Sequence, residues 1–383
     1  MKRFHFVKAA AVSALGLSSA HAVPELKFED NAELFATGTA SATYDDNIFL
    51  NSGKRTGDEI FNFVPGLDLP FGSSSEVSGD AFARVGLVDY ASNASQDARL
   101  PDFGFDSNYD EGKSKFALSA SYDEVAENNA TIRLNNVIVR TDLTNASVYG
   151  ESGLTEKTSL GAGAEFFEST YNQPGFVDSS VVSVPVDVYY GFSPKTDVSV
   201  GYKFTNSHQG DNQPSYDTNF LNAGVRGEFT PLLTGQIRVG YDILNFDRQP
   251  AAHASRNGDQ LGVDGSFTYA ITDKSSYSLN ISNGYTNTGT GVVVKNLSIG
   301  VDGTTEIDPQ WKILPGVAYS RQTYPGGNPE RQDSILTGSA GIQYVYSTYA
   351  NVSLTYALNN DSSNVSGISY SDSRVTLALN LRY

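Results

Sequence analysis

The fold is decided by stretches such as FSPKTDVSVGYKFT, residues 192–205, in which a short turn leads into a strictly alternating segment. The turn centres on Pro194 and Lys195, because proline presets the backbone angle and lysine keeps the tip in water. Side chains of a strand alternate between its two faces, so the segment indicates a β-strand with one apolar and one polar face. The apolar positions are Val198, Val200, Tyr202 and Phe204, and the positions between them are Ser199, Gly201, Lys203 and Thr205.

The same unit recurs along the chain with a period of roughly 38 residues. Clear copies of the turn start at Leu154, Phe192, Phe229, Ile271, Ile307 and Tyr346, and weaker copies start at Leu69 and Tyr109. A membrane-crossing strand needs about 9–11 residues, so two strands, one tight turn and one longer loop account for the period. We therefore predict about nine successive hairpins rather than a solenoid or a propeller.

Charged residues in these segments fall on the polar positions, where they would avoid the cost of about 2–4 kcal/mol of a charge facing lipid. A soluble β-sandwich would also alternate. Aromatic residues near the strand ends and the small, glycine-rich polar set favour a membrane barrel instead. We predict an all-β fold, a transmembrane antiparallel up-and-down β-barrel of about 18 strands with both termini in the periplasm.

The first residues have the pattern of a secretory signal peptide. Lys2, Arg3 and Lys8 precede a short apolar run, Ala9–Leu17, and cleavage is expected after Ala22. The expected organisation is a signal peptide at 1–22, a short periplasmic segment at 23–33 and an outer-membrane barrel at 34–383. The predicted location is the bacterial outer membrane.

The composition restricts the class of protein. The chain has no cysteine, 39% hydrophobic residues and a formal net charge of −17. No run of about 18 apolar residues is present, so no membrane-spanning helix is predicted. Removal of the three basic residues near the N-terminus leaves 23 basic against 43 acidic residues, a net charge near −20. Nucleic acid is therefore an unsuitable partner, since phosphate contacts need a basic face. Acidic loops instead suit a surface that meets lipopolysaccharide and divalent cations.

No cofactor, metal centre or catalytic site is expected. His208 and His253 are both expected in outer loops, and no cluster of cysteine or histidine offers a zinc site. No Gly-x-Ser-x-Gly motif is present, although a barrel protease or phospholipase remains an alternative. The acid pair Asp45-Asp46 could hold Ca²⁺ together with Asn47, but a capped, solvated loop is the favoured interpretation.

The last strand ends on an aromatic residue at the last position of the sequence. Its apolar positions are Val375, Leu377, Leu379, Leu381 and Tyr383. This strand resembles the terminal strand by which outer-membrane proteins are recognised by the barrel assembly machinery, although phenylalanine is the commoner last residue there. We predict that Leu377, Leu379, Leu381 and Tyr383 form the assembly signal, and that the last strand pairs with the first around residues 35–44.

Several short motifs resemble a family of outer-membrane β-barrel porins. They are the segment at residues 41–49, SATYDDNIF, the segment Val64-Pro65-Gly66-Leu67 and the turns of the Leu-Thr-Glu-Lys-Thr type at residue 154. The resemblance extends over most of the chain after the signal peptide. It implies a porin-like barrel, and members of the family are often linked to exopolysaccharide or capsule export. The family has no agreed catalytic residues to carry over.

The polar register predicts the residues that line the lumen. They are Glu165, Asp187, Lys203, Arg226, Glu228, Arg238, Asp242, Asp264, Asp302 and Lys312. Because acid is in excess overall, a passive or solute-selective channel would favour cations. Two alternatives remain open: a conduit that works with polysaccharide export components, and a non-conducting barrel whose loops fold inward.

Overall fold

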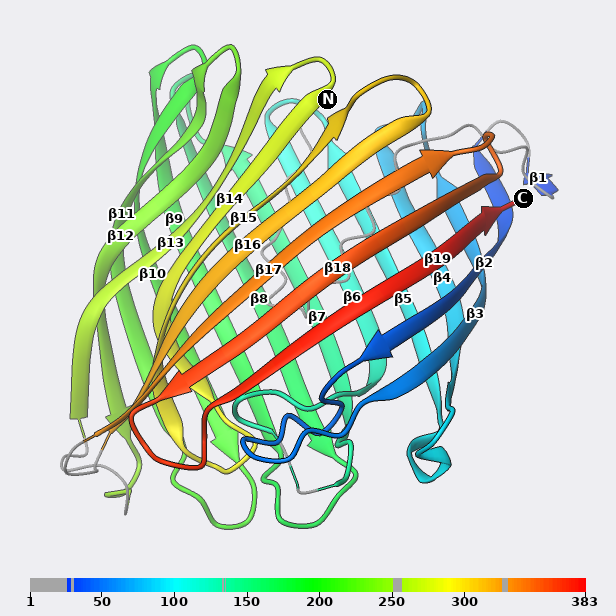
Figure 1. Ribbon diagram of the computed structural model, residues 1–383. Helices are drawn as coiled ribbons and strands as arrows, with labels where there is room; N and C mark the ends of the chain where they lie inside the picture. Colours follow the sequence, from blue (N-terminus) through cyan, green and yellow to red (C-terminus); the bar gives the residue numbers. More distant parts are fainter. Residues whose placement is uncertain (1–25, 29–30, 133, 135, 251–256, 326–329) are drawn as a thin grey trace.

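In the computed structural model, which describes residues 26–28, 31–132, 134, 136–250, 257–325 and 330–383, eighteen long antiparallel strands form the wall (Figure 1). The predicted count of 18 strands and the up-and-down topology are confirmed. The strands are β2 (Ala32–Asp45), β3 (Asp58–Phe71), β4 (Val77–Tyr90), β5 (Ala98–Asp110), β6 (Ser114–Ala126), β7 (Arg140–Gly153), β8 (Thr158–Tyr171), β9 (Ser179–Ser193), β10 (Thr196–Gln209), β11 (Tyr216–Thr230), β12 (Leu233–Phe246), β13 (Asn257–Thr272), β14 (Ser275–Asn287), β15 (Val293–Glu306), β16 (Trp311–Tyr324), β17 (Arg331–Val345), β18 (Ala350–Ser363) and β19 (Tyr370–Arg382). One short 3₁₀ turn, η1 (Ala94–Gln96), lies between β4 and β5, and none of the described helices is long and apolar enough to span a bilayer.

The sheet closes on itself because the last strand pairs with the first. The ladder runs from Arg374 opposite Asp45 to Arg382 opposite Thr37, and Tyr383 exchanges two backbone hydrogen bonds with Ala36. We call this β19–β2 pairing the closing seam. The predicted closure of the last strand on the first is confirmed. Closure removes both sheet edges, which would otherwise leave unpaired backbone groups in the bilayer.

The two ends of the barrel differ in the length of their connections. At one end the strands are joined by turns of two to five residues, and at the other by loops of five to 13 residues. The short-turn end is at the top of Figure 1, and the start of β2 and the end of β19 both lie there. Most predicted turns are correctly placed. The turn predicted from Leu69 is too early, since β3 continues to Phe71.

The N-terminal boundaries also differ in detail from the expectation. The first barrel strand begins at Ala32, and a short strand β1 (Leu26–Phe28) pairs with its first residues. The predicted signal peptide, residues 1–22, lies outside the described residues. His208 is not in a loop as predicted, because β10 extends to Gln209; His253 lies outside the described residues.

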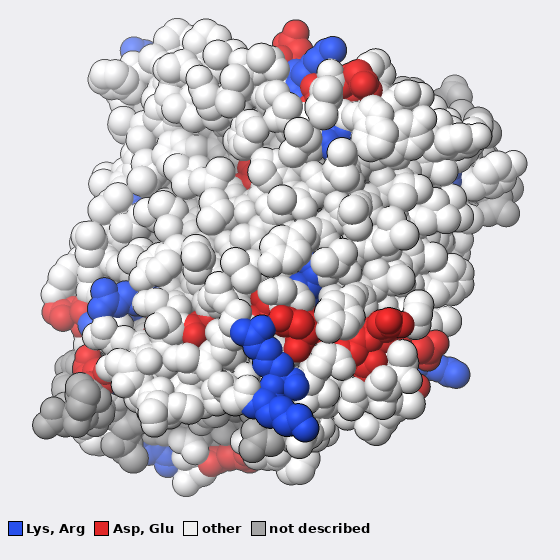
Figure 2. All heavy atoms as spheres, in the orientation of Figure 1, with Lys and Arg blue, Asp and Glu red and all other residues white. Residues whose placement is uncertain are grey.

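The two faces of the wall have the predicted chemistry. In β10, Val198, Val200 and Tyr202 are 39, 64 and 42% exposed, whereas Ser199 between them is 7% exposed. Charged side chains on the visible surface gather toward the two ends of the barrel and are sparse across its middle (Figure 2). Such an apolar band is what a bilayer requires of the outward face, so the polar set faces the interior.

Glycine in the inward set makes room for larger neighbours. Gly201 lies between Asp187 on β9 and Asn222 on β11 in the register of the sheet. A Cβ atom at position 201 would lie 2.0 Å from the Asp187 carboxylate. The small residue is therefore needed so that the Asp187 side chain can lie flat against the inner wall.

Candidate functional site in the barrel lumen and its mouth

The inner face of the wall is identified by a contact that spans five strands. Arg226 on β11 donates two hydrogen bonds to the Glu151 carboxylate on β7, at 2.6 and 2.7 Å. Strands β8, β9 and β10 separate the two residues in the sheet. Neighbouring strands are about 4.8 Å apart, so side chains this far apart can meet only across the concave face. Arg226 and Glu151 therefore point into the lumen.

This pair is the centre of a polar network on the inner wall. Arg226 also binds Asp197 at 3.0 Å, and its guanidinium group lies 3.4 Å from the centre of the Tyr189 ring. Arg238 on β12 binds Asp187 at 3.1 Å and the Tyr189 hydroxyl at 2.9 Å. Each guanidinium is thus matched by carboxylates and an aromatic face. We call Glu151, Asp187, Tyr189, Arg226 and Arg238 the lumen strut.

The register places the other predicted lumen residues on the same face as Arg226. Facing residues of antiparallel strands point to the same side of the sheet. Stepwise pairings lead from Arg226 to Gln236, then to Ser266 and on through each following strand to Asp372, so all of these residues share the inner face. All ten predicted residues, Glu165, Asp187, Lys203, Arg226, Glu228, Arg238, Asp242, Asp264, Asp302 and Lys312, lie on this face. Their contact with a permeating solute stays a prediction.

The structure brings together only some of these residues. Arg238 faces Asp264 across the β12–β13 ladder. Lys203 on β10 lies over the ring of Phe220, its partner on β11, and Phe220 in turn faces Asp242 on β12. Lys312 pairs with Glu306 at 2.9 Å, and Glu228 pairs with Lys195 at the short-turn end. The predicted positive side chains therefore largely have acidic neighbours.

Sequence reasoning missed an acidic patch on β3, β4, β5 and β6. By register, Asp68, Asp80, Asp102, Asp106 and Asp123 share the inner face. Arg84 binds Asp68 at 2.9 Å. The alternation in residues 102–106, DFGFD, indicates which side chains share the polar face. The turn signals around this segment are weak, so its polar residues were not assigned to the lumen. We call these five residues the acidic wall.

Loops fold into the barrel at the long-loop end. In residues 46–57, Ile48 and Phe49 pack with Tyr90 and Ile138, and Leu50, at 1% exposed, packs with Ala130 and Tyr370. Tyr370 begins β19, and Ile138 and Ala130 belong to the loop between β6 and β7. Two loops that begin on different strands, β2 and β6, therefore share a packed interior.

The loop at residues 127–139 meets a loop that begins on nearly the opposite side of the barrel. Ile132 lies against Gly289, where a Cβ atom would be 3.0 Å from the isoleucine Cγ1. Gly289 lies between β14 and β15, which are nearly opposite β6 and β7 in the strand order. Arg331 at the start of β17 reaches the Ala130 carbonyl from another direction, at 3.5 Å. The two loops narrow the mouth of the lumen, and they lie together at the lower end in Figure 1.

The loop at 127–139 begins with a carboxyl group in an unfavourable environment. Burial raises the pKa of the Glu127 carboxyl above its usual range, and the positive charge of Arg374 offsets part of the rise. Arg374 projects from β19 on the inner face, where it binds Asp45 and Asp372. The charge state of this loop therefore depends on pH.

The segment around Asn47 forms a capped loop, as favoured from the sequence, but Asn47 and the three residues after it are buried rather than solvated. The Asn47 side chain is fully buried and accepts a hydrogen bond from the Asn51 amide. Its own amide group donates to the carbonyls of Asn51 and Ser371. The side chain thus fixes the loop to β19 and is not available as a Ca²⁺ ligand.

The predicted assembly residues lie on the outer face. Leu377, Leu379, Leu381 and Tyr383 are all exposed, and they alternate with inward residues such as Asn380. The Tyr383 ring packs beside Tyr349 from the preceding short turn, with 5.9 Å between ring centres. An apolar face that ends in aromatic rings suits a membrane interface.

Comparison with known proteins agrees with this geometry. Residues 217–383, which run from β11 to β19, match the family "Putative beta-barrel porin 2". This part of the chain is similar to a family of β-barrel porins, and the described chain as a whole is a closed β-barrel. The expected resemblance to a porin family is thereby confirmed for residues 217–383, whereas its extension to the rest of the chain and the link to polysaccharide export stay predictions.

Solved structures of similar fold come from Pseudomonas aeruginosa and Acinetobacter baumannii. OpdK of Pseudomonas aeruginosa, solved with vanillate, is 13% identical with a TM-score of 0.47, and 91% of this chain and 99% of that chain are covered. OccK2 (OpdF) of the same organism, in complex with glucuronate, is 9% identical with a TM-score of 0.49, covering 92% and 98%. OccAB3 of Acinetobacter baumannii is 10% identical with a TM-score of 0.46, covering 92% and 99%. No curated protein matches the sequence of the porin-like barrel.

Proposed function

We propose that the barrel is a narrow, cation-preferring channel for small solutes across the outer membrane and that it has no catalytic role. The observation that carries the proposal is the acidic wall. Its five carboxylates share the inner face of four adjacent strands, where Arg84 is bound to one of them. A lumen lined by one sign of charge between low-dielectric walls concentrates ions of the opposite sign.

The positive residues of the lumen strut do not cancel this field. Arg226 and Arg238 are held by the strut carboxylates Glu151 and Asp187 and by Asp197, on the strands that follow β6 around the wall. The strut therefore contributes little net positive charge, while it occupies part of the cross-section. A cation that passes between the strut and the acidic wall meets mainly negative charge.

A second candidate, a closed barrel, is favoured by the packing of the mouth loops. Leu50 and Val139 are almost fully buried there, with 1 and 0% exposed. Such packing restricts the passage of large solutes. A conduit for polysaccharide, the third possibility from the sequence, would require both loops to move away from the mouth.

Purified barrel in a planar bilayer tests the proposal. We expect small single-channel currents and, under a salt gradient, a reversal potential that indicates cation preference. If the native barrel gives no current and a variant lacking residues 128–138 does, the result would support a closed barrel. If neither protein gives a current and a deletion strain loses its surface glycan, the result would support the export function and refute the channel.

The route to the membrane completes the proposal. We infer that residues 1–22 direct export and are cleaved after Ala22, and that a short periplasmic segment from residue 23 precedes the first barrel strand, which begins at Ala32 and not at 34 as predicted. The short turns and both described chain ends would then face the periplasm, and the long loops would face lipopolysaccharide. The terminal residues Leu377, Leu379, Leu381 and Tyr383 would engage the barrel assembly machinery.

A further inference from the structure

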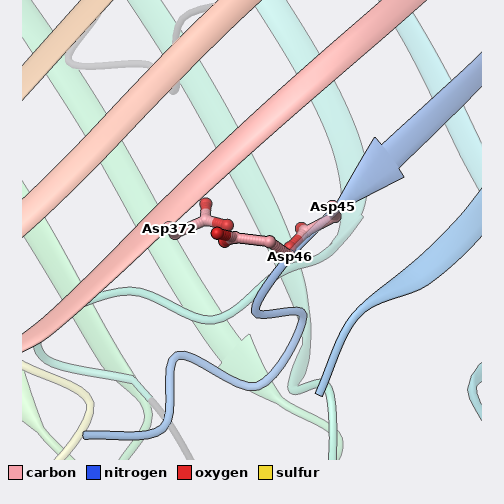
Figure 3. A group of neighbouring side chains, drawn as sticks. All are labelled: Asp45, Asp46 and Asp372. Atoms are coloured by element: carbon pink, nitrogen blue, oxygen red, sulfur yellow. The ribbon is translucent and has the colours of Figure 1, made fainter. Parts of the chain in front are cut away.

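Three carboxylates meet at the long-loop end of the closing seam. Asp45 is the last residue of β2, Asp46 follows it, and Asp372 is the third residue of β19. One oxygen atom of each lies within 4.8 Å of the others. Figure 3 shows the three side chains, which come from opposite ends of the sequence. The cluster therefore joins the first strand of the barrel to the last.

One oxygen of this cluster lacks the hydrogen bond that its burial demands. Asp372 is 1% exposed, and its Oδ1 atom has no hydrogen-bond partner. Its Oδ2 atom binds Arg374 at 2.9 Å. In Figure 3 the Asp372 carboxylate points toward that of Asp46. A buried carboxylate oxygen without a donor is strongly unfavourable, so a cation or a proton at this position would stabilise the cluster.

The arginines around the cluster leave negative charge in excess. Arg374 bridges Asp45 and Asp372, and Arg55 binds Asp46 at 2.8 Å. Next along the wall, Asp361 on β18 and Asp333 on β17 are also buried, and Arg331 pairs with Asp333. Within the cluster itself, three carboxylates face the guanidinium groups of Arg374 and Arg55. Buried charge that is not compensated within the protein attracts a cation or a proton.

We propose that Asp45, Asp46 and Asp372 bind a Ca²⁺ ion that clamps β19 to β2. Two oxygen ligands on one Ca²⁺ lie at most about 5 Å apart, because each Ca–O distance is about 2.4 Å. The spacing of the three oxygens fits this limit. Ca²⁺ also accepts irregular sets of carboxylate and water ligands better than Mg²⁺ does.

The nearby arginines set the expected strength of binding. Arg374 and Arg55 repel a cation, so the site should resemble weak extracellular Ca²⁺ modules, with a Kd of about 10⁻⁴–10⁻³ M. The long-loop end is the predicted extracellular end, where Ca²⁺ at such concentrations also bridges lipopolysaccharide. Occupancy would hold the closing seam and the start of the loop at 46–57 together.

Folded barrel in detergent, first dialysed against EDTA at neutral pH, provides the test. Ca²⁺ is titrated by calorimetry, and the temperature at which the folded gel band disappears is measured with and without Ca²⁺. We expect one bound ion and a higher unfolding temperature for the native chain. Asp372→Asn and Asp46→Asn should each weaken binding by about tenfold or more, because each removes a charged ligand. Asp211→Asn, an exposed loop acid, is the matched control.

Each other outcome overturns the proposal. No heat of binding and no thermal shift in the native chain would mean that Arg374 and a proton alone compensate the cluster. An equal shift in the native chain and in both cluster variants would mean that Ca²⁺ acts elsewhere on the surface. An equal response to Mg²⁺ would indicate general charge screening. Asp46→Asn keeps the test informative if Asp372→Asn does not fold, since Asp46 is partly exposed.

Discussion

Substitution of Arg226 by methionine tests whether the lumen strut braces the barrel. The change removes two hydrogen bonds to Glu151, one to Asp197 and the stacking on Tyr189. The Arg226 and Glu151 side chains are only 15 and 9% exposed, so the variant leaves a carboxylate poorly hydrated. Removing one partner of a buried ion pair costs about 3–5 kcal/mol, and access of lumen water places the expected loss near the lower value.

The measurement is urea unfolding of the refolded barrel in lipid vesicles, followed by the folded gel band. Arg226→Met should lower the free energy of unfolding by about 3 kcal/mol, and adding Glu151→Gln should restore part of the loss, since the two residues are coupled. Lys195→Met is the control: its pair with Glu228 is exposed and should contribute less than about 1 kcal/mol. Equal losses for Arg226→Met and Lys195→Met would refute the bracing role.

Four further predictions concern the channel, its loops and its assembly. Asp80→Asn combined with Asp106→Asn should reduce cation preference, seen as a reversal potential closer to zero; an unchanged potential would exclude the acidic wall as the selectivity element. Phe49→Ala should disrupt the loop at 46–57 at a cost of about 3–5 kcal/mol of packing and increase single-channel conductance, and unchanged currents would show that this loop does not narrow the path. Because the pKa of Glu127 is raised in the folded loop, packing there is most stable at low pH and is weakened as the pH rises through that pKa; currents should increase over the same range, and Glu127→Gln should abolish the dependence. Deletion of Tyr383, or its change to Asp, should leave export intact and reduce the heat-modifiable folded form in outer membranes, whereas native amounts of folded barrel would show that the aromatic end is dispensable.

The wall of the barrel could be predicted because its signals are local. The alternation from Val198 to Phe204 and the turn at Pro194 each lie within one hairpin, and their period is set by backbone geometry. The inward positions of Arg226 and Arg238 follow from the same alternation. Where the turn signals were weak, between residues 92 and 141, the polar register was not assigned, and the acidic wall was missed.

The contents of the lumen could not be predicted because they depend on curvature and on closure. Nothing in the sequence pairs Arg226 with Glu151, since the two meet only after five strands have bent around a common axis. The burial of residues 48–50, IFL, has a sequence signal: three apolar residues in succession stand in an otherwise polar loop. Asp372 joins Asp45 and Asp46 only when the sheet is closed, so the sequence, in which Asn47 is their neighbour, contains no indication that Asp372 lies beside them.

The closing seam has a consequence for the order of events in folding. Its hydrogen bonds join residues more than 300 positions apart, for example Thr39 and Asn380, so the ring cannot be completed before the last strand exists. In the finished ring, however, this pair of strands is hydrogen-bonded like any other, and no strand is first. A chain cut at another short turn and joined between its present ends could form the same ring, although it would display a different final residue during synthesis. Recognition of Tyr383 by the assembly machinery would then depend on which residue ends the chain, whereas the stability of the barrel would depend only on the closed ring of strands. The two contributions can therefore be measured separately.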